Sequence, residues 1–456
     1  MGKIATVVGL GISGLGAARL LREKGWTVRV TEGADTTEIE ERVRALDRLG
    51  GVRLEIGRHT RPFIEDADLV VASPGVKDIS APLVWARELN IPIIDETELG
   101  YRFCPAKIVA VTGTNGKSTT TALVGEILKA GRKKVVVCGN IGLSFCEKVI
   151  GLRRDGIVVL EISSFQLQRA VRFRPYVSLF LNITQNHLDR HRDFREYLNA
   201  KLNIFKNQKN SDWAILNCED KNMKHLNRHI KPRILYFGNS LDADGVCLKM
   251  GLIHLVNNGK REFFLGTQEL ALKGEHNLKN AMAAILVGGI FRIRQEVIKD
   301  VLRNFKGLEH RCEYVAEKEG ITFINDSKAT TVDAAMCAMR SLDRPIILIA
   351  GGRDKGSDFT VLKGLIEERV KAIVLIGEAR AKIKTQLLGS TKMYEAEDLK
   401  KAVDLSFDLA NEGDAVLLSP MCASFDMFKN FEERGECFKK AVMKLKERSA
   451  ELCRIQ

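Results

Sequence analysis

The chain has 456 residues, of which 45% are hydrophobic and 28% are charged, and its formal net charge is +13. This length is enough for about two to four domains that each bury a core of their own. No apolar run reaches the roughly 18 residues needed to span a bilayer. The composition therefore excludes an integral membrane protein, and we expect neither a signal peptide nor a stable membrane association.

The ten cysteines lie far apart in the sequence, and none forms a CxxC pair. The sequence therefore predicts neither a zinc site nor a disulfide framework, and the thiols fit a cytoplasmic protein. The basic charge has two interpretations, a nucleic-acid partner or solvated surface cations that also attract anionic substrates. Because aromatic residues make up only 6% of the chain and no basic run is interleaved with them, we expect no nucleic-acid partner.

The first α/β segment begins with an apolar strand, and its alternation of strands and helices weakens near Gly100–Pro105. The expected elements are a strand at Ile4–Gly9, a helix around Ala17–Lys24, and strands at Thr27–Thr31, Asp68–Ala72 and Ile91–Ile94. Short apolar strands that alternate with amphipathic helices are typical of doubly wound parallel sheets.

Two further α/β segments follow, with an expected linker between them at Asn304–Gly307. The second should contain strands at Lys107–Thr112, Lys134–Cys138, Ile157–Glu161 and Val177–Asn182, and a helix at Thr120–Lys129. The third should contain strands at Thr322–Asn325, Ile346–Ala350, Ala372–Ile376 and Ala415–Ser419, and a basic amphipathic helix at Asn430–Arg454. We therefore predict three domains, over residues 1–100, 101–307 and 308–456.

A glycine-rich loop opens the second segment, where an apolar strand runs into Gly113-Thr114-Asn115-Gly116-Lys117-Ser118-Thr119 and then into a helix. Glycines allow backbone N–H groups to close around phosphate oxygens, and the helix presents its positive N-terminal end to them. Lys117 can reach the β- and γ-phosphates of ATP, and Ser118 or Thr119 can bind Mg²⁺. The spacing departs from GxxxxGK[ST], because Val111 occupies the position of the first glycine.

A second glycine-rich loop, Gly9-Leu10-Gly11-Ile12-Ser13-Gly14, lies between the first strand and the first helix. It matches the dinucleotide-binding fingerprint, and Glu32 stands where a ribose-binding acid is expected. A nucleotide-linked substrate held by its pyrophosphate would account for both loops in one chain. Two other classes remain open here: an NAD-dependent dehydrogenase, and a P-loop switch or nucleic-acid motor.

Beyond these loops, a series of short motifs extends over essentially the whole chain. They are GLGISG at 9–14, VASPGV at 71–76, GTNGKST at 113–119, GNIG at 139–142, EISSFQL at 161–167, NITQNHLDRH at 182–191, YLNAK at 197–201, HNLKNAMAA at 276–284, HRCE at 310–313, NDSKAT at 325–330 and SPMCASFDMFKNFEERG at 419–435. In this order the motifs resemble the Mur ligases, and within them the branch that adds D-glutamate. The resemblance implies three α/β domains: a Rossmann-like N-terminal domain, a central P-loop ATPase domain with a mostly parallel sheet, and a Rossmann-like C-terminal domain.

The resemblance also implies ATP-dependent amide bond formation in the cytoplasm, in the synthesis of a peptidoglycan precursor. The carboxylate of UDP-N-acetylmuramoyl-L-alanine would attack the γ-phosphate of ATP, and the amine of D-glutamate would then displace phosphate. Such a reaction depends on charge neutralisation around phosphates and on a positioned carboxylate. We expect ATP, Mg²⁺ at two sites and a monomer. Sibling ligases for L-alanine, a diamino acid or a dipeptide, and folylpolyglutamate synthases, remain alternatives because they share the ATP loop.

By this resemblance, the catalytic and metal-binding residues come from the second segment. Glu161 would bind Mg²⁺ together with Ser118 or Thr119, and His187 corresponds to a ligand of a second metal ion. Lys201 matches a lysine that these ligases carbamylate, which turns a cation into an anionic oxygen ligand. The expected catalytic residues are therefore Lys117, Glu161, His187 and Lys201.

The resemblance assigns substrate-binding residues in all three segments. The adenosine and phosphates of ATP would contact Asn280, Arg311 and Asp326 in addition to the loop Gly113–Thr119. The UDP-linked substrate would contact Gly11, Ser13, Gly14, Glu32, Gly75, Asn140 and His187. D-Glutamate would contact Lys328, Thr330, Lys355, Ser424 and Phe431. Because this last set lies in the third segment, the resemblance implies domain closure before chemistry.

A few positions depart from the family pattern. Gln185 and Asn186 are neutral, and Asn186 stands where an acid usually precedes the histidine. Met421 stands where a small residue is common. The run Glu32-Gly33-Ala34 lacks the basic residue that some relatives place near the uridine or its phosphates. None of these departures removes a residue to which we assign chemistry.

Overall fold

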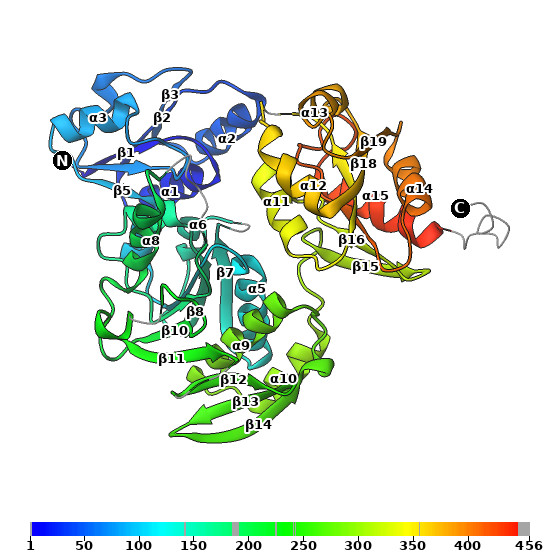
Figure 1. The fold of residues 1–456 in the computed structure, drawn as a ribbon. Helices are drawn as coiled ribbons and strands as arrows, with labels where there is room; N and C mark the ends of the chain where they lie inside the picture. Colours follow the sequence, from blue (N-terminus) through cyan, green and yellow to red (C-terminus); the bar gives the residue numbers. More distant parts are fainter. Residues whose placement is uncertain are drawn as a thin grey trace, which may run out of the picture. The chain divides into compact units, whose positions relative to one another are not determined.

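The structure is a computed structural model of the chain. It describes residues 2–140, 143–184, 191–223, 226–239, 241, 243–354 and 356–445. Across these residues the chain divides into two compact units, Met1–Phe305 and Lys306–Gln456, and its strands form sheets of five, nine and six strands (Figure 1). The expected three-domain α/β fold is thus confirmed. The domain bounds at residues 100 and 307 stay a prediction, since the first two sheets share one unit.

The first sheet is parallel and has the order β3-β2-β1-β4-β5. Its strands are β1 (Ile4–Val8), β2 (Thr27–Glu32), β3 (Val52–Ile56), β4 (Leu69–Ala72) and β5 (Ile93–Asp95). Its helices are α1 (Ile12–Glu23), α2 (Thr37–Asp47), α3 (Ala81–Glu88) and α4 (Glu96–Phe103), with a 3-10 turn at Arg61–Phe63. Because β1 lies at the centre, the loop that follows it opens at the carboxyl edge, where such sheets bind nucleotides.

The second sheet has the order β14-β13-β12-β11-β10-β9-β6-β8-β7 among the described residues. Its parallel strands are β6 (Lys107–Thr112), β7 (Lys134–Gly139), β8 (Gly156–Glu161), β9 (Val177–Phe180), β10 (Trp213–Asn217), β11 (Arg233–Gly238) and β12 (Gly245–Lys249). An antiparallel extension adds β13 (Leu252–Asn257) and β14 (Lys260–Gly266). The helices are α5 (Lys117–Ala130), α6 (Phe145–Val149), α7 (Ser164–Gln168), α8 (Phe194–Leu202), α9 (Glu275–Ile290) and α10 (Gln295–Asn304), with 3-10 turns at Asn203–Phe205, Leu226–Arg228 and Thr267–Glu269.

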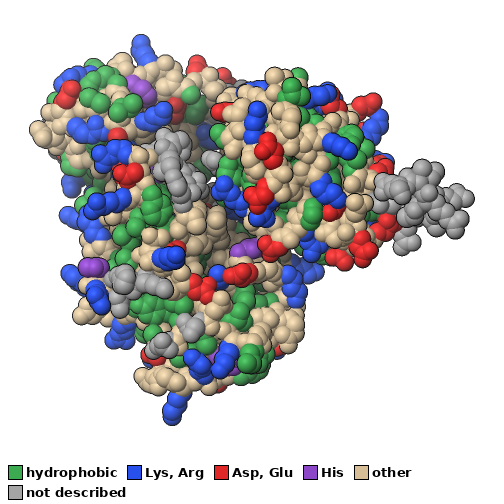
Figure 2. All heavy atoms as spheres, viewed as in Figure 1, with side chains coloured by type: hydrophobic (Ala, Val, Ile, Leu, Met, Phe, Trp, Pro, Cys, Tyr) green, Lys and Arg blue, Asp and Glu red, His purple; other side chains and the backbone are tan. Residues whose placement is uncertain are grey.

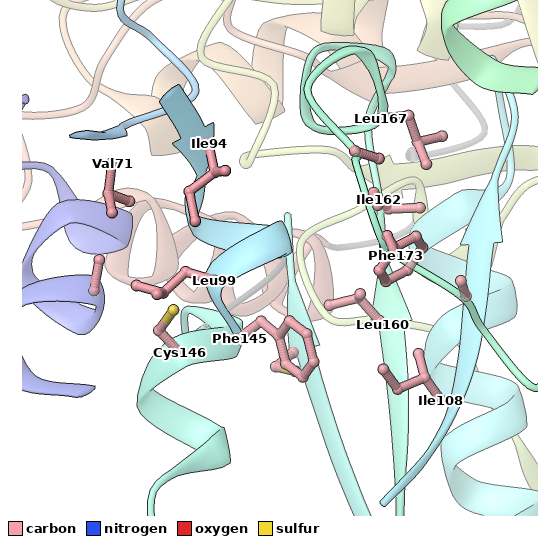
Figure 3. Close-up of a cluster of buried hydrophobic side chains, with 14 of the residues drawn as sticks. Val71, Ile94, Leu99, Ile108, Phe145, Cys146, Leu160, Ile162, Leu167 and Phe173 are labelled. Atoms are coloured by element: carbon pink, nitrogen blue, oxygen red, sulfur yellow. The ribbon is translucent and has the colours of Figure 1, made fainter. Parts of the chain in front are cut away.

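One buried cluster joins the first two sheets (Figure 3). Figure 3 shows Val71 and Ile94 of the first sheet and Ile108 and Leu160 of the second within it. Helix α4 lies in this region and ends at Phe103. The alternation of strands and helices therefore continues through Gly100, and the prediction that it weakens near Gly100–Pro105 was wrong. The α4 helix forms there because the side chain of Asp95 caps it by accepting from the N–H of Glu98 at 2.8 Å.

The third sheet, in the second unit, has the order β15-β16-β20-β17-β18-β19. The strands are β15 (Glu313–Lys318), β16 (Ile321–Asn325), β17 (Ile346–Gly351), β18 (Val370–Ile376), β19 (Lys392–Glu395) and β20 (Ala415–Leu418), and β15 alone of these is antiparallel to its neighbour. The helices are α11 (Val332–Arg340), α12 (Lys363–Arg369), α13 (Arg380–Gln386), α14 (Leu399–Leu409) and α15 (Phe431–Lys444), with a 3-10 turn at Thr360–Leu362.

The predicted helix at Asn430–Arg454 is confirmed over Phe431–Lys444, and Asn430 is its N-cap. Residues 446–454 of that prediction lie outside the described part of the chain. On the face drawn in Figure 2, Lys and Arg side chains are spread over both units and are interleaved with acidic ones on the second. Among the described helices, none has the length and apolar character required to cross a bilayer.

Candidate functional site

The loop between β6 and α5 turns at Gly116, whose φ of 81° lies in the left-handed region that favours glycine. Gly116 is also the N-cap of α5, so the free N–H groups of the first helical turn are directed toward the loop. A Cβ on Gly116 would lie 2.3 Å from Oδ1 of Asn280 on α9. Backbone and packing therefore both require glycine, and they place the buried Asn280 directly against this loop.

Asn182, which follows β9, fixes the conformation of the same loop. Its Oδ1 accepts hydrogen bonds from the N–H groups of Thr114 and Asn115 at 3.1 and 2.8 Å. Its Nδ2 donates to the carbonyl oxygen of Asn115 at 3.0 Å. The sequence interpretation missed Asn182 as a site residue. Its place at the start of NITQNHLDRH was the available signal, because β9 lies beside β6 in the sheet.

Two lysine side chains converge on the carbonyl groups of the loop. Lys117 Nζ donates to the oxygens of Gly113 and Thr114 at 3.1 and 2.7 Å. Lys201 Nζ, from α8, donates to the Gly113 oxygen at 2.9 Å and to Oγ1 of Thr112 at 3.3 Å. Burial of Lys201, which is 2% exposed, together with the neighbouring ammonium of Lys117, lowers the pKa of Lys201 well below its usual value. Burial and the like charge of Lys117 thus both make the charged form of Lys201 less favourable than it is in water.

Glu161 is the last residue of β8, in register with Val111 of β6. Its side chain is buried, and Oε1 accepts a hydrogen bond from Nδ2 of Asn140 at 3.0 Å. The other oxygen, Oε2, is buried and accepts no hydrogen bond from any described residue. A buried carboxylate oxygen in this state requires a cation or a donor beyond those that the described residues supply. Together with the buried hydroxyl-bearing Ser118 in the first turn of α5, this donor set fits Mg²⁺.

Several expected site residues lie outside the described part of the chain: His187 and the unusual Gln185 and Asn186 beside it, and Lys355. The next histidine along the chain, His191, is described and buried. Its ring stacks on Phe165 with centroids 5.2 Å apart, and its Nε2 lies 3.1 Å from Oγ of Ser164. These contacts are those of a packed structural histidine.

A cavity of about 630 Å³ opens within the first unit, above the carboxyl edges of β1, β2 and β4 and beside the end of β7. Five of the residues expected at the UDP-linked substrate line it: Gly11, Ser13, Glu32, Gly75 and Asn140. The remaining lining residues are Val8, Gly9, Ile12, Arg42, His59, Ser73, Pro74, Val76, Gly139, Ser144 and Gln166. The cavity therefore contains residues of both the first and the second sheet, and it is large enough for a nucleotide.

Gly14 does not line this cavity, although it belongs to the fingerprint. A Cβ on Gly14 would lie 2.0 Å from the carbonyl oxygen of Gly9, so this glycine permits close contact between α1 and the β1 loop. Glu32 lines the cavity, but both of its carboxylate oxygens already accept hydrogen bonds from backbone N–H groups. Oε2 accepts from the N–H of Leu10 at 2.6 Å, and Oε1 accepts from the N–H of Ala34 at 2.8 Å. In the described structure Glu32 thus fixes the glycine-rich loop.

In the second unit, the expected D-glutamate residues Lys328 and Phe431 lie together, with the Lys328 ammonium 5.7 Å from the centre of the Phe431 ring. Arg434 supports this arrangement from α15 and was missed in the sequence. Its buried guanidinium donates through Nε and Nη2 to Oγ and the carbonyl oxygen of Ser327, at 3.0 and 2.9 Å. Burial lowers the pKa of Arg434 to about 10, so it stays charged at neutral pH.

Thr330 lies two residues after Lys328 in the same loop, and its N–H donates to the carbonyl oxygen of Lys328 at 2.8 Å. Arg434 also donates through Nη1 to the carbonyl oxygen of Cys422 at 3.2 Å, two residues before the buried Ser424. The guanidinium therefore connects the loop of Lys328 and Thr330 with the loop of Ser424. Met421, the departure in this region, is fully buried with a φ of 62°.

Asp326, which we expect at the ATP ribose, directly follows β16, and its side chain is buried. Its Oδ1 accepts from the N–H of Cys312 at 3.1 Å, and its Oδ2 accepts from the hydroxyl of Ser419 at 2.9 Å. Burial raises the pKa of Asp326 to about 6. In this unit Asp326 fixes the segment that carries Arg311, which is exposed.

The fold and the two glycine-rich loops are those of a nucleotide-binding protein with three α/β domains. Three family models match the chain: "Mur ligase MurD-like, N-terminal domain" at residues 3–95, "Mur ligase middle domain" at 111–288, and "Mur ligase, glutamate ligase domain" at 310–422. A relative from Koribacter versatilis named UDP-N-acetylmuramoylalanine–D-glutamate ligase is 41% identical over 452 residues, which cover 98% of each chain. The chain therefore belongs to the Mur ligase family.

Further relatives with the same name have similar identity. The one from Caldicellulosiruptor bescii is 43% identical over 97% of this chain and 98% of its own length. Among solved structures, UDP-N-acetylmuramate-alanine ligase MurC from Thermotoga maritima is 22% identical, with a TM-score of 0.57 over 98% of this chain and 100% of its own. MurF ligase from the same organism, in complex with ADP, is 16% identical, with a TM-score of 0.55 over 91% and 95%. These structures share the fold of this chain.

Proposed function

We propose that this protein is an ATP-dependent ligase that joins D-glutamate to UDP-N-acetylmuramoyl-L-alanine in peptidoglycan precursor synthesis. The observation that carries the proposal is the 41–43% identity, over nearly the full length of both chains, to relatives that bear this name. Two features of the site support it independently: the ATP loop at Gly113–Thr119, and a separate nucleotide-sized cavity beside the Gly9–Gly14 loop.

The reaction would proceed in two displacements. A carboxylate oxygen of the L-alanyl group attacks the γ-phosphorus of ATP, the bond to the bridging oxygen breaks, and ADP leaves. The amine nitrogen of D-glutamate then attacks the acyl carbon, the bond from carbon to the phosphate oxygen breaks, and phosphate leaves as the amine loses a proton. Lys117 and the N-terminal N–H groups of α5 would hold the phosphate oxygens and neutralise the charge that moves onto them.

Mg²⁺ would be held by Glu161 and Ser118, and when bound it neutralises charge on the phosphate oxygens of ATP. The unpartnered buried Oε2 of Glu161 is the feature that supports this assignment. A second Mg²⁺ would use His187 and a carbamylated Lys201. The lowered pKa of Lys201 supports this modification, because the neutral amine nitrogen adds to the carbon of CO₂ and releases one proton.

The C-terminal domain, proposed to cover residues 308–456, would bind D-glutamate. Lys328 and Lys355 would pair with its two carboxylates, and Thr330, Ser424 and Phe431 would complete the site. Arg434 would act as a positioning residue, since it holds Ser327 and Cys422 without belonging to the expected contacts. Asn280, Arg311 and Asp326 would surround the adenosine and phosphates of ATP. We also propose that the protein acts in the cytoplasm as a monomer.

A phosphate-release assay with a panel of amino acids tests this function. Phosphate should appear only when ATP, UDP-N-acetylmuramoyl-L-alanine and D-glutamate are all present. L-Glutamate, L-alanine, lysine and a D-alanyl dipeptide serve as matched alternatives for the sibling activities. Turnover with one of these at the rate seen with D-glutamate would contradict the proposal, as would phosphate release without the UDP-linked substrate.

A further inference from the structure

The cavity in the first unit has two chemically different walls. One wall is the glycine-rich loop and the start of α1, at Gly11 and Ser13, where backbone N–H groups favour phosphate. The other wall lies past the ends of β2 and β3, where His59 and Arg42 line the cavity. In Rossmann-like sheets the pyrophosphate lies at the β1 loop and the ribose at the end of β2. The base of a bound nucleotide should therefore lie farther out, against His59.

The contacts of Thr31 determine which nitrogen of the His59 ring carries the proton. The Thr31 hydroxyl lies 2.9 Å from Oε2 of Glu55 and 2.7 Å from Nδ1 of His59. Burial opposes ionisation of Glu55, but the hydrogen bonds from Thr60 and Thr31 hold its pKa below the usual value. The carbonyl oxygen of Arg58 lies 3.2 Å from the same hydroxyl of Thr31. Since this oxygen and the carboxylate of Glu55 can only accept, the single proton of the Thr31 hydroxyl goes to one of them and not to Nδ1 of His59.

It follows that His59 Nδ1 donates to the Thr31 hydroxyl, and that in the ring form with one proton Nε2 carries a lone pair. Nε2 makes no hydrogen bond with any described residue, and the half-buried His59 lines the cavity. A Cβ on Gly33 would lie 3.0 Å from Nε2, so a side chain at that position would crowd the nitrogen. Glu32, the other acceptor in this region, already accepts from Leu10 and Ala34.

We propose that Nε2 of His59 accepts the N3–H of uracil and so makes the cavity selective for uridine over cytidine nucleotides. The inference rests on the proposed function, which places a UDP-linked substrate here, and it names the residue that recognises the base. Uracil carries a proton on N3, whereas cytosine has a lone pair there, which would face the lone pair of Nε2. On the same wall, the guanidinium of Arg42 donates through Nη1 to the carbonyl oxygen of Leu10 at 3.2 Å and so places a positive charge at the cavity.

The test compares UDP and CDP as competitive inhibitors of the full-length enzyme against UDP-N-acetylmuramoyl-L-alanine. The wild type should prefer UDP, and His59→Ala should reduce the ratio of the two inhibition constants about tenfold. His59→Gln should keep part of the preference, because its amide oxygen is again an acceptor. His254→Ala, at a histidine of β13 outside the cavity, is the matched control and should leave the ratio unchanged.

If His59 had a purely structural role, its replacement by Ala would weaken the binding of UDP and CDP equally and leave the ratio of their inhibition constants unchanged. That result would overturn the inference. A wild type without preference for UDP would overturn it as well. Should the His59 variants fail to fold, ¹⁵N NMR spectra of the histidines in the wild type decide. We expect an unprotonated Nε2 of His59 whose chemical shift changes when UDP is added and stays the same with CDP. A protonated Nε2 would contradict the inference. If the wild type does not turn over UDP-N-acetylmuramoyl-L-alanine at all, the proposed function fails first.

Discussion

The two glycine-rich loops follow equivalent strands of different sheets, yet the chain fixes them with different groups. The first loop is held by an acid and a hydroxyl: Glu32 accepts from Leu10 N–H, and Ser73 donates to the Gly9 oxygen at 2.8 Å. The second is held by the amide of Asn182 and by the side-chain nitrogens of Lys117 and Lys201, which both donate to the carbonyl oxygen of Gly113.

This difference indicates what each loop accommodates. A triphosphate that transfers its terminal group concentrates negative charge, and cations close to the loop compensate for it. A substrate bound only through a pyrophosphate needs oriented N–H groups and recognition of its base and sugar. The first loop has a large cavity for the second purpose. We therefore expect substitutions at the second loop to reduce turnover and substitutions at the first to reduce stability or substrate binding.

The largest effect is expected for Lys117→Ala, which removes the cation that the second loop directs at phosphate. Turnover should fall by roughly 10³-fold or more, because the charge on the transferred phosphoryl group loses a partner. Steady-state phosphate release measures this loss. Lys129→Ala, at the exposed end of the same helix, is the matched control and should retain full activity. Retention of activity in Lys117→Ala would contradict the role of this loop.

Lys201→Ala should lower kcat by about 10²-fold, since it removes the buried amine that would be carbamylated. Short carboxylates such as formate or acetate should restore part of the rate, because they supply the missing anionic oxygens. Lys206→Ala, at an exposed lysine shortly after α8, serves as the control. An absence of rescue would count against the carbamate and would leave the ligase function standing.

Asn182→Ala should raise the KM for ATP roughly five- to tenfold, which corresponds to a net loss of about 1–1.4 kcal/mol of binding free energy when the loop is no longer held in place. The KM for the UDP-linked substrate should stay unchanged, because Asn182 contacts only the second loop among the hydrogen bonds described above. Separate substrate titrations check this difference. Equal changes in both KM values would mean that the two loops are not independent.

The smallest effect on catalysis is expected for Gly14→Ala in the first loop. Its Cβ would lie 2.0 Å from the Gly9 oxygen, so the fold should lose about 1–3 kcal/mol of unfolding free energy. Gly11→Ala is the matched control for stability, because nothing lies within 4 Å of its added Cβ. Urea denaturation followed by circular dichroism measures both variants. A Gly14→Ala protein as stable as the wild type would contradict this packing.

The sequence predicted the central parallel strands, because buried strands such as β6 and β17 are short, uninterrupted apolar runs. It missed the parallel strands β3, β10, β11, β12 and β19. It also missed the antiparallel strands β13, β14 and β15, which are only partly buried. Helix α4 was also missed, since it opens with the polar run Glu96-Thr97-Glu98, and its apolar residues Leu99, Tyr101 and Phe103 join the core only through the fold.

In the candidate site, residues such as Lys117 and Glu161 could be predicted from the sequence, because each belongs to a short motif of neighbouring residues. Asn182, His59 and Arg434 were not, since their partners are distant in sequence and only the fold brings them together. The tautomer of His59 depends on Glu55 and Thr31, which come from two different strands. No pattern within one segment contains that information.

The central claim is that the chain forms an amide bond through an acyl phosphate, and isotope transfer tests it most directly. UDP-N-acetylmuramoyl-L-alanine labelled with ¹⁸O in both carboxylate oxygens would be turned over with unlabelled ATP and D-glutamate. The account predicts one ¹⁸O atom in each phosphate released and one in the new amide, read by mass spectrometry. Phosphate free of ¹⁸O would contradict it, because the oxygen would then have come from water.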